Sequence, residues 1–429
     1  MIGLMILENR IQNYAWGSKS ALARLMNRPV AGDPEAELWV GAHPQAPSAV
    51  KLAGRRVTLD RLVAEHPSEM LGPVVHRFGP VLPFLLKVLA VAEPLSIQAH
   101  PSLAQAAEGF AREEAAGIGV DASNRNYRDR NHKPELAVAL EPYWQLCGFR
   151  RYSEMVRHLR AVVSSSLQAA VDELQMRPTE AVLGSLMEIA LQLSDRQRAE
   201  LVRRAQAYAG RQLQVGDGSY SNKESQVASA APSDATAARW VQRLSSGHPG
   251  DAGVISPYLL NLLRLDPGEG IYIGAGTLHA ALQGTAVEIQ ANSNNVLRGG
   301  LTVKHVDVPE LLRVARFAPQ EPHVLRPVPG GGEERHYPTP AVEFALSTVA
   351  LDKLRQEAAL ARTIAGPEIL LFLYGDAAVT DFDGHTVNCR SGEAVFVPAA
   401  VKGYRVRGRA TMFRARVPLP PDRARPIQP

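Results

Sequence analysis

The chain has 429 residues, a length that corresponds to several domains of roughly 100 to 200 residues each. Hydrophobic residues make up 45% of the sequence and charged residues 21%, as in globular proteins, which excludes wholesale disorder. A net charge of +4 is too small over this length to create a polyanion-binding surface, so we expect no nucleic-acid partner.

The cysteines and the apolar stretches indicate where the protein resides. Cys147 and Cys389 have no paired metal-ligand spacing and are expected to be buried thiols. The longest apolar stretch, Val81–Ile97, contains prolines and charged residues and cannot span a bilayer. The apolar opening Met1–Leu7 lacks a basic leader and a cleavage site, so it predicts a first strand. We therefore expect a cytoplasmic protein without membrane contact.

The first 150 residues show short, punctuated strand patterns. Strands are predicted at the opening and over Glu37–Gly41 and Phe84–Ala90. Turn-forming sequences such as Trp16-Gly17-Ser18 separate such segments. The region is therefore expected to be mixed β structure with small helices.

A helical pattern follows from about Ser153 to Leu244. Apolar residues recur with helical spacing in three segments, namely Met155–Val163, Ala181–Leu193 and Ala199–Ala207. Thr179 lies where the second helix should begin, and Ser194 with Gln197 forms a capping box ahead of the third. The Ser- and Ala-rich stretch Val215–Ala237 has little apolar patterning and is predicted to be a mobile loop.

Strand patterns return after Asp251. Three strands are predicted here, over Leu259–Leu265, Ile271–Ile273 and Thr285–Gln290. The Pro- and Gly-rich stretch Pro319–Pro340 looks like a linker, and short strands with glycine turns follow to about Val417. The fold is therefore expected to be mainly β with an α-helical insert, and both β regions suit double-sheet jelly-roll barrels.

Several polar side chains are candidates for a metal site. Ser96, Gln98 and His100 alternate onto one face of a strand. If His132 and Lys133 face opposite sides, Lys133 and Glu135 share one side. His279 follows a tight turn at a strand start. The set of nitrogen and oxygen ligands that suits a borderline divalent ion is Gln98, His100, Glu135 and His279.

Cationic residues stand within apolar segments and near a polar turn. Lys87 and Lys133 must be paired or face a cavity if their strands are buried, whereas an edge strand would leave them in solvent. The segment from Thr285 to Lys304 contains Glu288, Arg298 and Lys304 and could present a guanidinium group to an anion. Its Asn294-Asn295 and Gly299-Gly300 pairs are equally explained as turns.

Other catalytic motifs are absent from the sequence. It contains no G-x-S-x-G elbow, no Walker loop and no H-E-x-x-H motif. Trp16 and the other tryptophans show no spacing of a base-stacking platform, so they are expected to form pocket walls or core.

Long segments of the chain closely resemble the type I mannose-6-phosphate isomerases. They are IQNYAWGSKSAL (Ile11–Leu22), AELWVGAHP (Ala36–Pro44), LPFLLKVLAVAEPLSIQAHPS (Leu82–Ser102), RNYRDRNHKPELAVAL (Arg125–Leu140) and HAALQGTAVEIQANSNNVLRGGLTVKHVDVPELL (His279–Leu312). The resemblance implies a cupin-type jelly-roll catalytic domain over 1–150 and 251–318. It also implies an inserted helical domain over 151–250 and a C-terminal cupin-like β domain over 319–429.

The resemblance also implies roles for individual residues. The family's single Zn²⁺ ligand set falls on Gln98, His100, Glu135 and His279, and its essential arginine falls on Arg298. Lys133 and Lys87 match the lysines of the H-K-P-E and P-F-L-x-K segments. Family members commonly carry tyrosine where this chain has Ala281, which puts the role of that hydroxyl and the substrate range in doubt.

The implied reaction interconverts mannose 6-phosphate and fructose 6-phosphate through a cis-enediol, feeding mannose and GDP-mannose metabolism. Such a reaction needs a base on one face of the substrate and an electrophile at both oxygens. Lys133, Glu288 and His132 are the candidate bases. Arg298, supported by Lys304 and Ser96, is expected to hold the phosphate or charge on the intermediate. Further substrate-binding candidates are Lys87, Trp16 and His132.

Alternatives to this function remain open from the residues alone. A non-catalytic sugar-binding cupin would need the metal but no base, and an iron-dependent cupin enzyme or an isomerase for another phosphosugar would use a similar pocket. We expect one Zn²⁺ per chain, a small phosphosugar substrate and a monomer.

Overall fold

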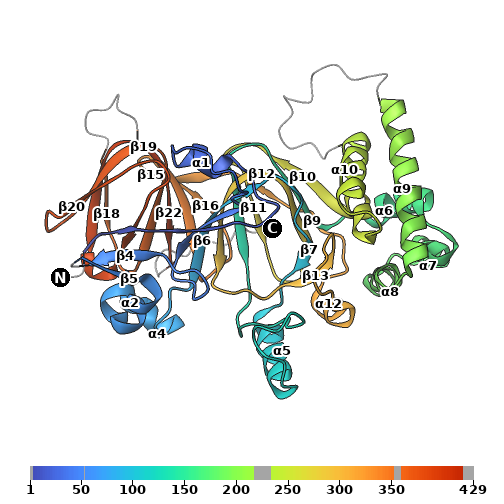
Figure 1. Ribbon diagram of the computed structural model, residues 1–429, viewed down its shortest axis with the longest axis horizontal. Helices are drawn as coiled ribbons and strands as arrows, with labels where there is room; N and C mark the ends of the chain where they lie inside the picture. Colours follow the sequence, from blue (N-terminus) through green and yellow to red (C-terminus); the bar gives the residue numbers. More distant parts are fainter. Residues whose placement is uncertain (1–2, 53, 217–232, 352–358, 419–429) are drawn as a thin grey trace.

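The computed structural model describes residues 3–52, 54–216, 233–351 and 359–418. Two β units lie side by side: a first unit in the middle of the molecule and a second unit, formed largely by the C-terminal region, at one end. A group of helices lies at the opposite end, next to the first unit (Figure 1). The prediction of a sheet-rich chain with a helical region is confirmed. Among the described residues, no helix combines the length and apolar character needed to cross a membrane.

The first β unit is an eleven-stranded sheet built from the N-terminal region and from residues after 259. Its strands are β2 (Arg10–Gln12), β3 (Glu37–Gly41), β6 (Phe84–Val91), β7 (Ile97–Ala99), β8 (Glu135–Ala139), β9 (Tyr143–Phe149), β10 (Leu260–Leu265), β11 (Gly270–Ile273), β12 (His279–Ala291), β13 (Leu297–Gly300) and β14 (Val324–Leu325). The predicted strands at 37–41, 84–90 and 271–273 are thus confirmed, and the strand predicted over 285–290 is the second half of the longer β12.

Strand β12 holds the two parts of this sheet together. Its first part pairs with β7 and β9, and its second part pairs with β6 and β8. Between them lies a register shift at Ala281/Gln283, followed by Gly284 at φ 116°. A Cβ atom on Gly284 would come within 2.5 Å of the Pro142 carbonyl oxygen, so only glycine fits at this bend.

The second β unit is a nine-stranded sheet made largely of the C-terminal region. Its strands are β1 (Met5–Leu7), β15 (Val328–Gly331), β16 (Glu334–Tyr337), β17 (Ala345–Leu351), β18 (Ala359–Thr363), β19 (Glu368–Asp381), β20 (Thr386–Cys389), β21 (Ala394–Val397) and β22 (Gly403–Arg416). The prediction that Pro319–Pro340 is only a linker is wrong, because β14, β15 and β16 form within it and pair with neighbouring strands.

The opening strand β1 pairs with β21, with Met5 opposite Phe396. The N-terminus therefore belongs to the sheet formed by the C-terminal strands. A separate two-stranded ribbon joins β4 (Ala49–Leu52) and β5 (Arg55–Thr58).

The helical region contains α6 (Tyr152–Val162), α7 (Ser165–Met176), α8 (Glu180–Leu191), α9 (Asp195–Gly216) and α10 (Asp234–Gly247). Thr179 caps α8 by accepting a hydrogen bond from the Val182 N–H, as predicted. The mobile-loop prediction for Val215–Ala237 is wrong at both ends, because α9 continues to Gly216 and α10 begins at Asp234. Residues 217–232 lie outside the described part of the chain.

The remaining helices are short, apart from α5. They are α1 (Ala21–Leu25), α2 (Leu59–Glu65), α3 (Pro67–Leu71), α4 (Val75–Phe78), α5 (Leu103–Ala115), α11 (Ser256–Leu259) and α12 (Val308–Val314), with 3₁₀ turns at Gly72–Val74, Ala252–Ile255 and Ala399–Val401. Ser102 and Gln105 form a capping box at the start of α5.

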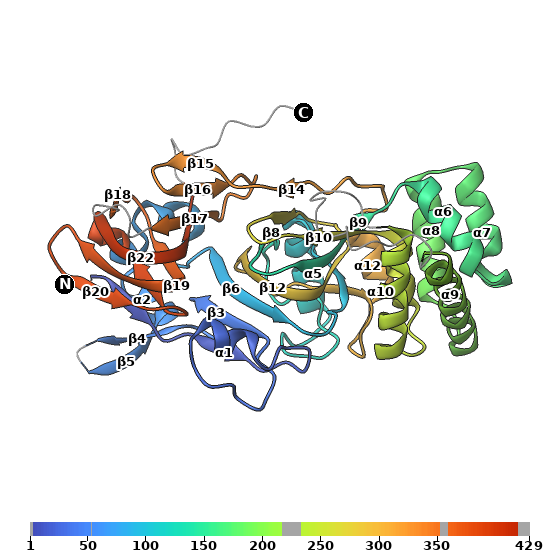
Figure 2. The same cartoon turned by 90° about the horizontal axis from the view of Figure 1, so that it is seen from above.

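Side-chain alternation decides which face of β6 and β12 is available for a site. Leu86, Val88, Val287 and Ile289 pack in one core cluster with Phe396 and Phe413 of the second sheet. Successive side chains of a strand point to opposite faces. Lys87 and Glu288, the residues between them, therefore face the interior of the first β unit, where β3, β6, β12 and β8 run side by side (Figure 2).

Candidate active site

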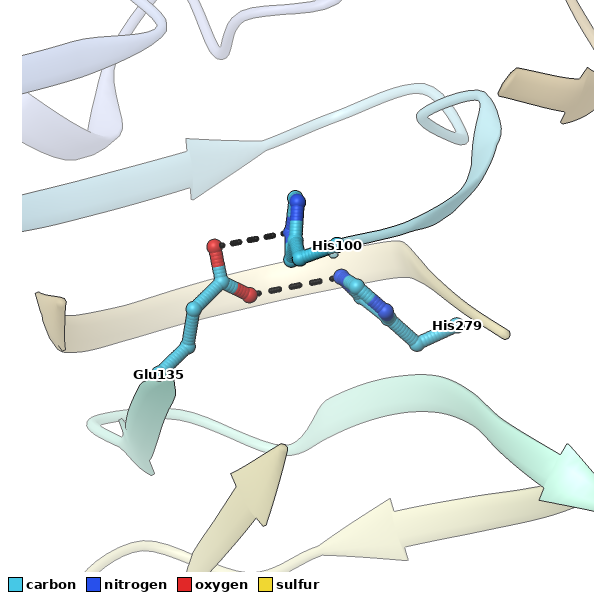
Figure 3. A group of neighbouring side chains, drawn as sticks. All are labelled: His100, Glu135 and His279. Carbon is cyan, nitrogen blue, oxygen red and sulfur yellow. Dashed lines mark ion pairs between the residues drawn. The ribbon is translucent and has the colours of Figure 1, made fainter. Parts of the chain in front are cut away.

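Two histidines and a glutamate meet in this interior. His100 follows β7, Glu135 begins β8, and His279 begins β12. His100 Nε2 lies 3.3 Å from Glu135 Oε1, and His279 Nε2 lies 3.3 Å from Glu135 Oε2 (Figure 3). The ligand atoms of the three side chains all lie within 4.8 Å of one another, so this metal triad could hold one metal ion.

The second nitrogen of each imidazole fixes the ring. His100 Nδ1 lies 2.7 Å from the Asn295 carbonyl oxygen, and His279 Nδ1 lies 2.9 Å from the Thr277 carbonyl oxygen. A carbonyl only accepts, so each Nδ1 carries the proton and each Nε2 presents a lone pair. Both Nε2 atoms are buried without a hydrogen-bond partner. Lone pairs directed at a carboxylate repel it unless a cation lies between them, so these residues fit a divalent metal ion.

Charges around the triad favour the same protonation states. Burial, and then the charge of Lys133, lowers the pKa of His100 to about 4. Burial alone would raise the pKa of Glu135, but Lys133 and His100 outweigh it and hold this pKa well below its usual range. Neutral imidazoles and an ionised carboxylate are the forms that bind metal.

The pairing register aligns the metal triad with two other predicted site residues. Gln98 lies opposite His279 on one side and opposite Arg298 on the other. His279 in turn lies opposite Cys147. Arg298, Gln98 and His279 thus form a row across β13, β7 and β12, and the metal-ligand role of Gln98 stays a prediction.

Lys87 lies among buried carboxylates on the inward face. Its Nζ is 3.3 Å from Glu288 Oε1 and 3.7 Å from Glu37 Oε2, and it stands over the Trp39 ring at 5.1 Å from the centroid. Burial lowers the Lys87 pKa, but Glu37, Glu288 and Glu135 outweigh this and raise it. Lys87 is therefore a paired cation, which excludes the edge-strand alternative.

The pKa of Glu288 is shifted in the opposite direction from that of Glu135. Its pKa is raised, first by burial and then by the charge of Glu135, although Lys87 and Lys133 act against this shift. A carboxyl group with a raised pKa holds a proton more readily than a free one, which is typical of groups that transfer protons. Glu37, which shares Lys87 with it, was missed in the sequence, and the signal was an acidic residue inside the apolar strand β3.

Lys133 and His132 point to different surroundings, as the alternation predicted. Lys133 Nζ lies 3.0 Å from Glu135 Oε1 and is buried. His132 Nε2 lies 2.8 Å from Glu343 Oε1, a residue that precedes β17. The structure therefore brings Lys133 to the metal triad but pairs His132 with a carboxylate elsewhere.

Three cationic residues, Arg298, Lys304 and Arg128, lie close together at the Arg298 end of the row formed by Arg298, Gln98 and His279. Burial, then the nearby charge of Arg128, lowers the pKa of half-buried Arg298. Burial, then Arg298 and Arg128, lowers the pKa of Lys304. Across the described residues, none of these three side chains forms an ion pair with a carboxylate. Neighbouring cations without a counter-charge attract anions, so this cluster matches the anion-binding role predicted for Arg298 and Lys304, which stays a prediction.

Asn295 explains how this site is held. It is fully buried, and its side-chain oxygen accepts a 2.7 Å hydrogen bond from the Arg128 N–H. Its own carbonyl oxygen orients His100. Asn295 is thus a positioning residue, and Arg128 is a further cation that sequence reasoning missed.

Known proteins identify the arrangement. The family model described as phosphomannose isomerase type I, catalytic domain, matches residues 4–152. Mannose-6-phosphate isomerase of Salmonella typhimurium is 38% identical over 401 residues, covering 92% of this chain and 94% of that protein. The Escherichia coli enzyme of the same name is 37% identical over 416 residues, with 95% and 98% coverage.

A solved structure adds the fold. It is mannose 6-phosphate isomerase from Salmonella typhimurium bound to fructose 6-phosphate and zinc, with a TM-score of 0.84 and 33% identity over 97% of this chain and 100% of that chain. The chain belongs to the type I phosphomannose isomerases. The family resemblance found in the sequence is confirmed, and with it membership of an enzyme family of isomerases.

Trp16 and Ser96, the remaining predicted site residues, lie around the same interior. Trp16 is stacked against Tyr14 at 5.8 Å and packs against a core cluster that contains Ala281. Ser96 precedes β7, and the register that pairs Gln98 with His279 puts Ser96 opposite Ala281. The Leu95 N–H donates a 2.8 Å hydrogen bond to the Ala281 carbonyl oxygen. Substrate contacts of Trp16 and Ser96 stay predictions.

The cysteines take no part in the site. Both are buried free thiols, as predicted. Burial, and then the charge of Glu135, raises the pKa of Cys147 to about 12, so this thiol stays protonated and unreactive.

Proposed function

We propose that the chain is a zinc-dependent aldose-ketose isomerase that interconverts mannose 6-phosphate and fructose 6-phosphate through a cis-enediol. The observation that carries this proposal is the pair of buried Nε2 atoms without a hydrogen-bond partner, both directed at Glu135. The relative from Salmonella typhimurium binds fructose 6-phosphate and zinc, which supports the choice of substrate and metal.

We assign the metal ligands to His100, Glu135, His279 and Gln98. When bound, Zn²⁺ supplies a Lewis acid that polarises a carbonyl oxygen and stabilises negative charge. The second-sphere carbonyls of Asn295 and Thr277 hold the two rings in place before the metal arrives. Gln98 lies two residues before His100 and opposite His279 in the sheet, which supports its assignment as a further metal ligand.

Proton transfer between the two substrate carbons falls to Lys133 or Glu288. Lys133 lies beside the metal triad, where its ammonium nitrogen is 3.0 Å from Glu135 Oε1. Glu288 has a raised pKa and shares the inward face. His132 is the weakest of the three candidates, because its imidazole pairs with Glu343.

We assign the substrate phosphate to the three cations Arg298, Lys304 and Arg128. Their mutual repulsion falls when a dianion binds, and the guanidinium groups can donate two parallel hydrogen bonds to it. Ser96, Trp16 and Lys87 complete the proposed substrate contacts, with Lys87 acting chiefly through the charge of Glu288.

The wider role belongs to the same proposal. An enzyme of this activity would feed mannose and GDP-mannose metabolism, and we expect it to act as a cytoplasmic monomer. The eleven-stranded and nine-stranded sheets would correspond to a cupin-type catalytic domain and a cupin-like C-terminal domain.

A coupled assay for conversion of mannose 6-phosphate to fructose 6-phosphate tests the proposal. The protein is assayed as purified, after chelation and after zinc is restored. We expect activity to disappear on chelation and to return with zinc. Absence of activity in protein with zinc bound would refute the reaction and favour a sugar-binding role or another phosphosugar.

A further inference from the structure

The inward face of β9 carries a polar group that the proposed reaction does not use. Tyr143 and Cys147 belong to the core cluster that contains Ala281, whereas Leu146 packs in the cluster shared with the helical region. Alternation along a strand therefore turns the Gln145 side chain toward the same interior as Tyr143 and Cys147.

This interior is the one that holds the metal triad. The cluster of Tyr143 and Ala281 also contains Leu89, Ala137 and Ala286. Each of them lies two positions along its strand from Lys87, Glu135 or Glu288. Leu89, Ala137 and Ala286 therefore share the inward faces of β6, β8 and β12 with these charged residues. Burial raises the pKa of Tyr143, and the charges of Glu288, Glu135 and Glu37 add to the shift, so the phenol stays neutral beside these carboxylates.

Gln145 lies one inward position along from the metal triad. In the β9–β12 register, Cys147 pairs with His279 and Gln145 pairs with Ala281. Positions two residues apart on a strand are separated by about 7 Å, which is the length of a few carbon atoms of an extended sugar chain. Ala281 lies between Gln145 and Ser96, and its methyl side chain cannot form a hydrogen bond to the amide.

The Gln145 amide has no protein partner. The residue is only 2% exposed, and neither its side-chain oxygen nor its nitrogen forms a hydrogen bond with any described residue, so the amide borders a space that solvent or a ligand can reach. Amides within a protein interior are nearly always bonded to protein groups, to water or to a ligand. An unbonded amide that faces a ligand-binding interior points to a ligand that supplies the missing bonds.

We propose that Gln145 is a substrate-binding residue whose amide bonds to hydroxyl groups of the phosphosugar beyond the carbons that react at the metal triad. An amide can accept a hydrogen bond from one hydroxyl and donate to its neighbour, as a vicinal diol requires. The inference rests on the proposed function, since it takes the phosphosugar as the ligand. It makes Gln145 a determinant of which sugar chain is accepted.

The test compares Gln145→Leu with wild type and with the control Gln283→Leu. Leucine keeps the size of the side chain and removes the amide, and Gln283 is an exposed neighbour on β12 that bonds to Arg243. Binding of mannose 6-phosphate and of inorganic phosphate to the zinc-loaded proteins is measured by calorimetry, together with turnover and the melting temperature.

We expect Gln145→Leu to weaken mannose 6-phosphate binding by roughly five- to tenfold, as loss of one to two neutral hydrogen bonds implies. Phosphate binding should stay within about twofold of wild type, because phosphate alone does not reach the amide. The melting temperature should not fall, because no protein hydrogen bond is lost. Gln283→Leu should match wild type in binding.

Three results would overturn the proposal: unchanged mannose 6-phosphate affinity, equal weakening of phosphate binding, or a melting temperature several degrees lower, which would assign a structural role. If leucine itself disturbs the fold, Gln145→Met supplies a second apolar variant of similar length. Wild-type protein that binds mannose 6-phosphate without converting it would refute the reaction, while the affinity ratio would still decide the role of Gln145.

Discussion

Replacement of Lys87 by methionine should destabilise the protein by an amount that depends on pH. The ammonium group lies 3.3 Å from Glu288 and 3.7 Å from Glu37. At an effective dielectric constant of about 20, each such pair attracts by about 5 kcal/mol, most of which offsets the cost of burying the charges. Loss of the cation alone leaves buried carboxylates uncompensated, and we expect a loss of about 3–5 kcal/mol at pH 8.

The pH dependence follows from the pKa of Glu288. This pKa is already raised by burial and by Glu135, and removal of Lys87 raises it further. A carboxyl group whose pKa is higher in the folded state favours folding below its unfolded value, and this benefit is lost as pH rises through the folded value. The penalty of Lys87→Met should therefore be smaller at pH 5 than at pH 8, because the raised pKa favours the protonated form of Glu288 as the pH falls.

Urea unfolding at the two pH values measures these free energies. The double variant Lys87→Met/Glu288→Gln removes both charges and should recover about 2–3 kcal/mol of the loss at pH 8. Lys51→Met is a matched control on an exposed lysine whose side chain is 76% accessible, and it should cost less than about 0.5 kcal/mol. A loss below about 1 kcal/mol at pH 8, or strict additivity of the two substitutions, would refute the reasoning.

Three further predictions concern other charged groups. Arg298→Ala should abolish turnover with an unchanged melting temperature, and near-normal activity would remove Arg298 from the site. Arg414→Met leaves buried Glu368 without its cation and should cost about 3–5 kcal/mol in urea unfolding, whereas the exposed Arg409→Met on the same strand should be neutral. Because the His100 pKa is lowered to about 4, its contribution to stability is present above its unfolded value and is lost as pH falls through about 4. Metal analysis after dialysis should accordingly show zinc retained at pH 5.5, and its loss there would contradict a neutral His100.

Local features of the fold could be predicted because neighbouring residues determine them. The two-residue alternation predicted β3 and β6, and the hydroxyl of Thr179 marked the start of α8. Helices α7 and α10 were missed, because their Ala- and Ser-rich sequences have weak apolar periodicity.

The candidate site was predictable to the extent that its members carry distinctive chemistry. His100, Glu135 and His279 were proposed from residue type and family resemblance, and the structure brings them together. Gln145 gave no such signal, because a glutamine in a strand is unremarkable until the pairing register shows which face it occupies.

Residue patterns and the family resemblance were enough to predict β3, β6, the types of the metal ligands and the family. Which side chains come together depends on how the strands pair in three dimensions. Lys87 finds Glu37 and Glu288 through three adjacent strands, and β1 joins β21 from the opposite end of the chain. Local patterns depend on residues a few positions apart, whereas these contacts depend on strand order and register, which are set by the packing of the whole sheet.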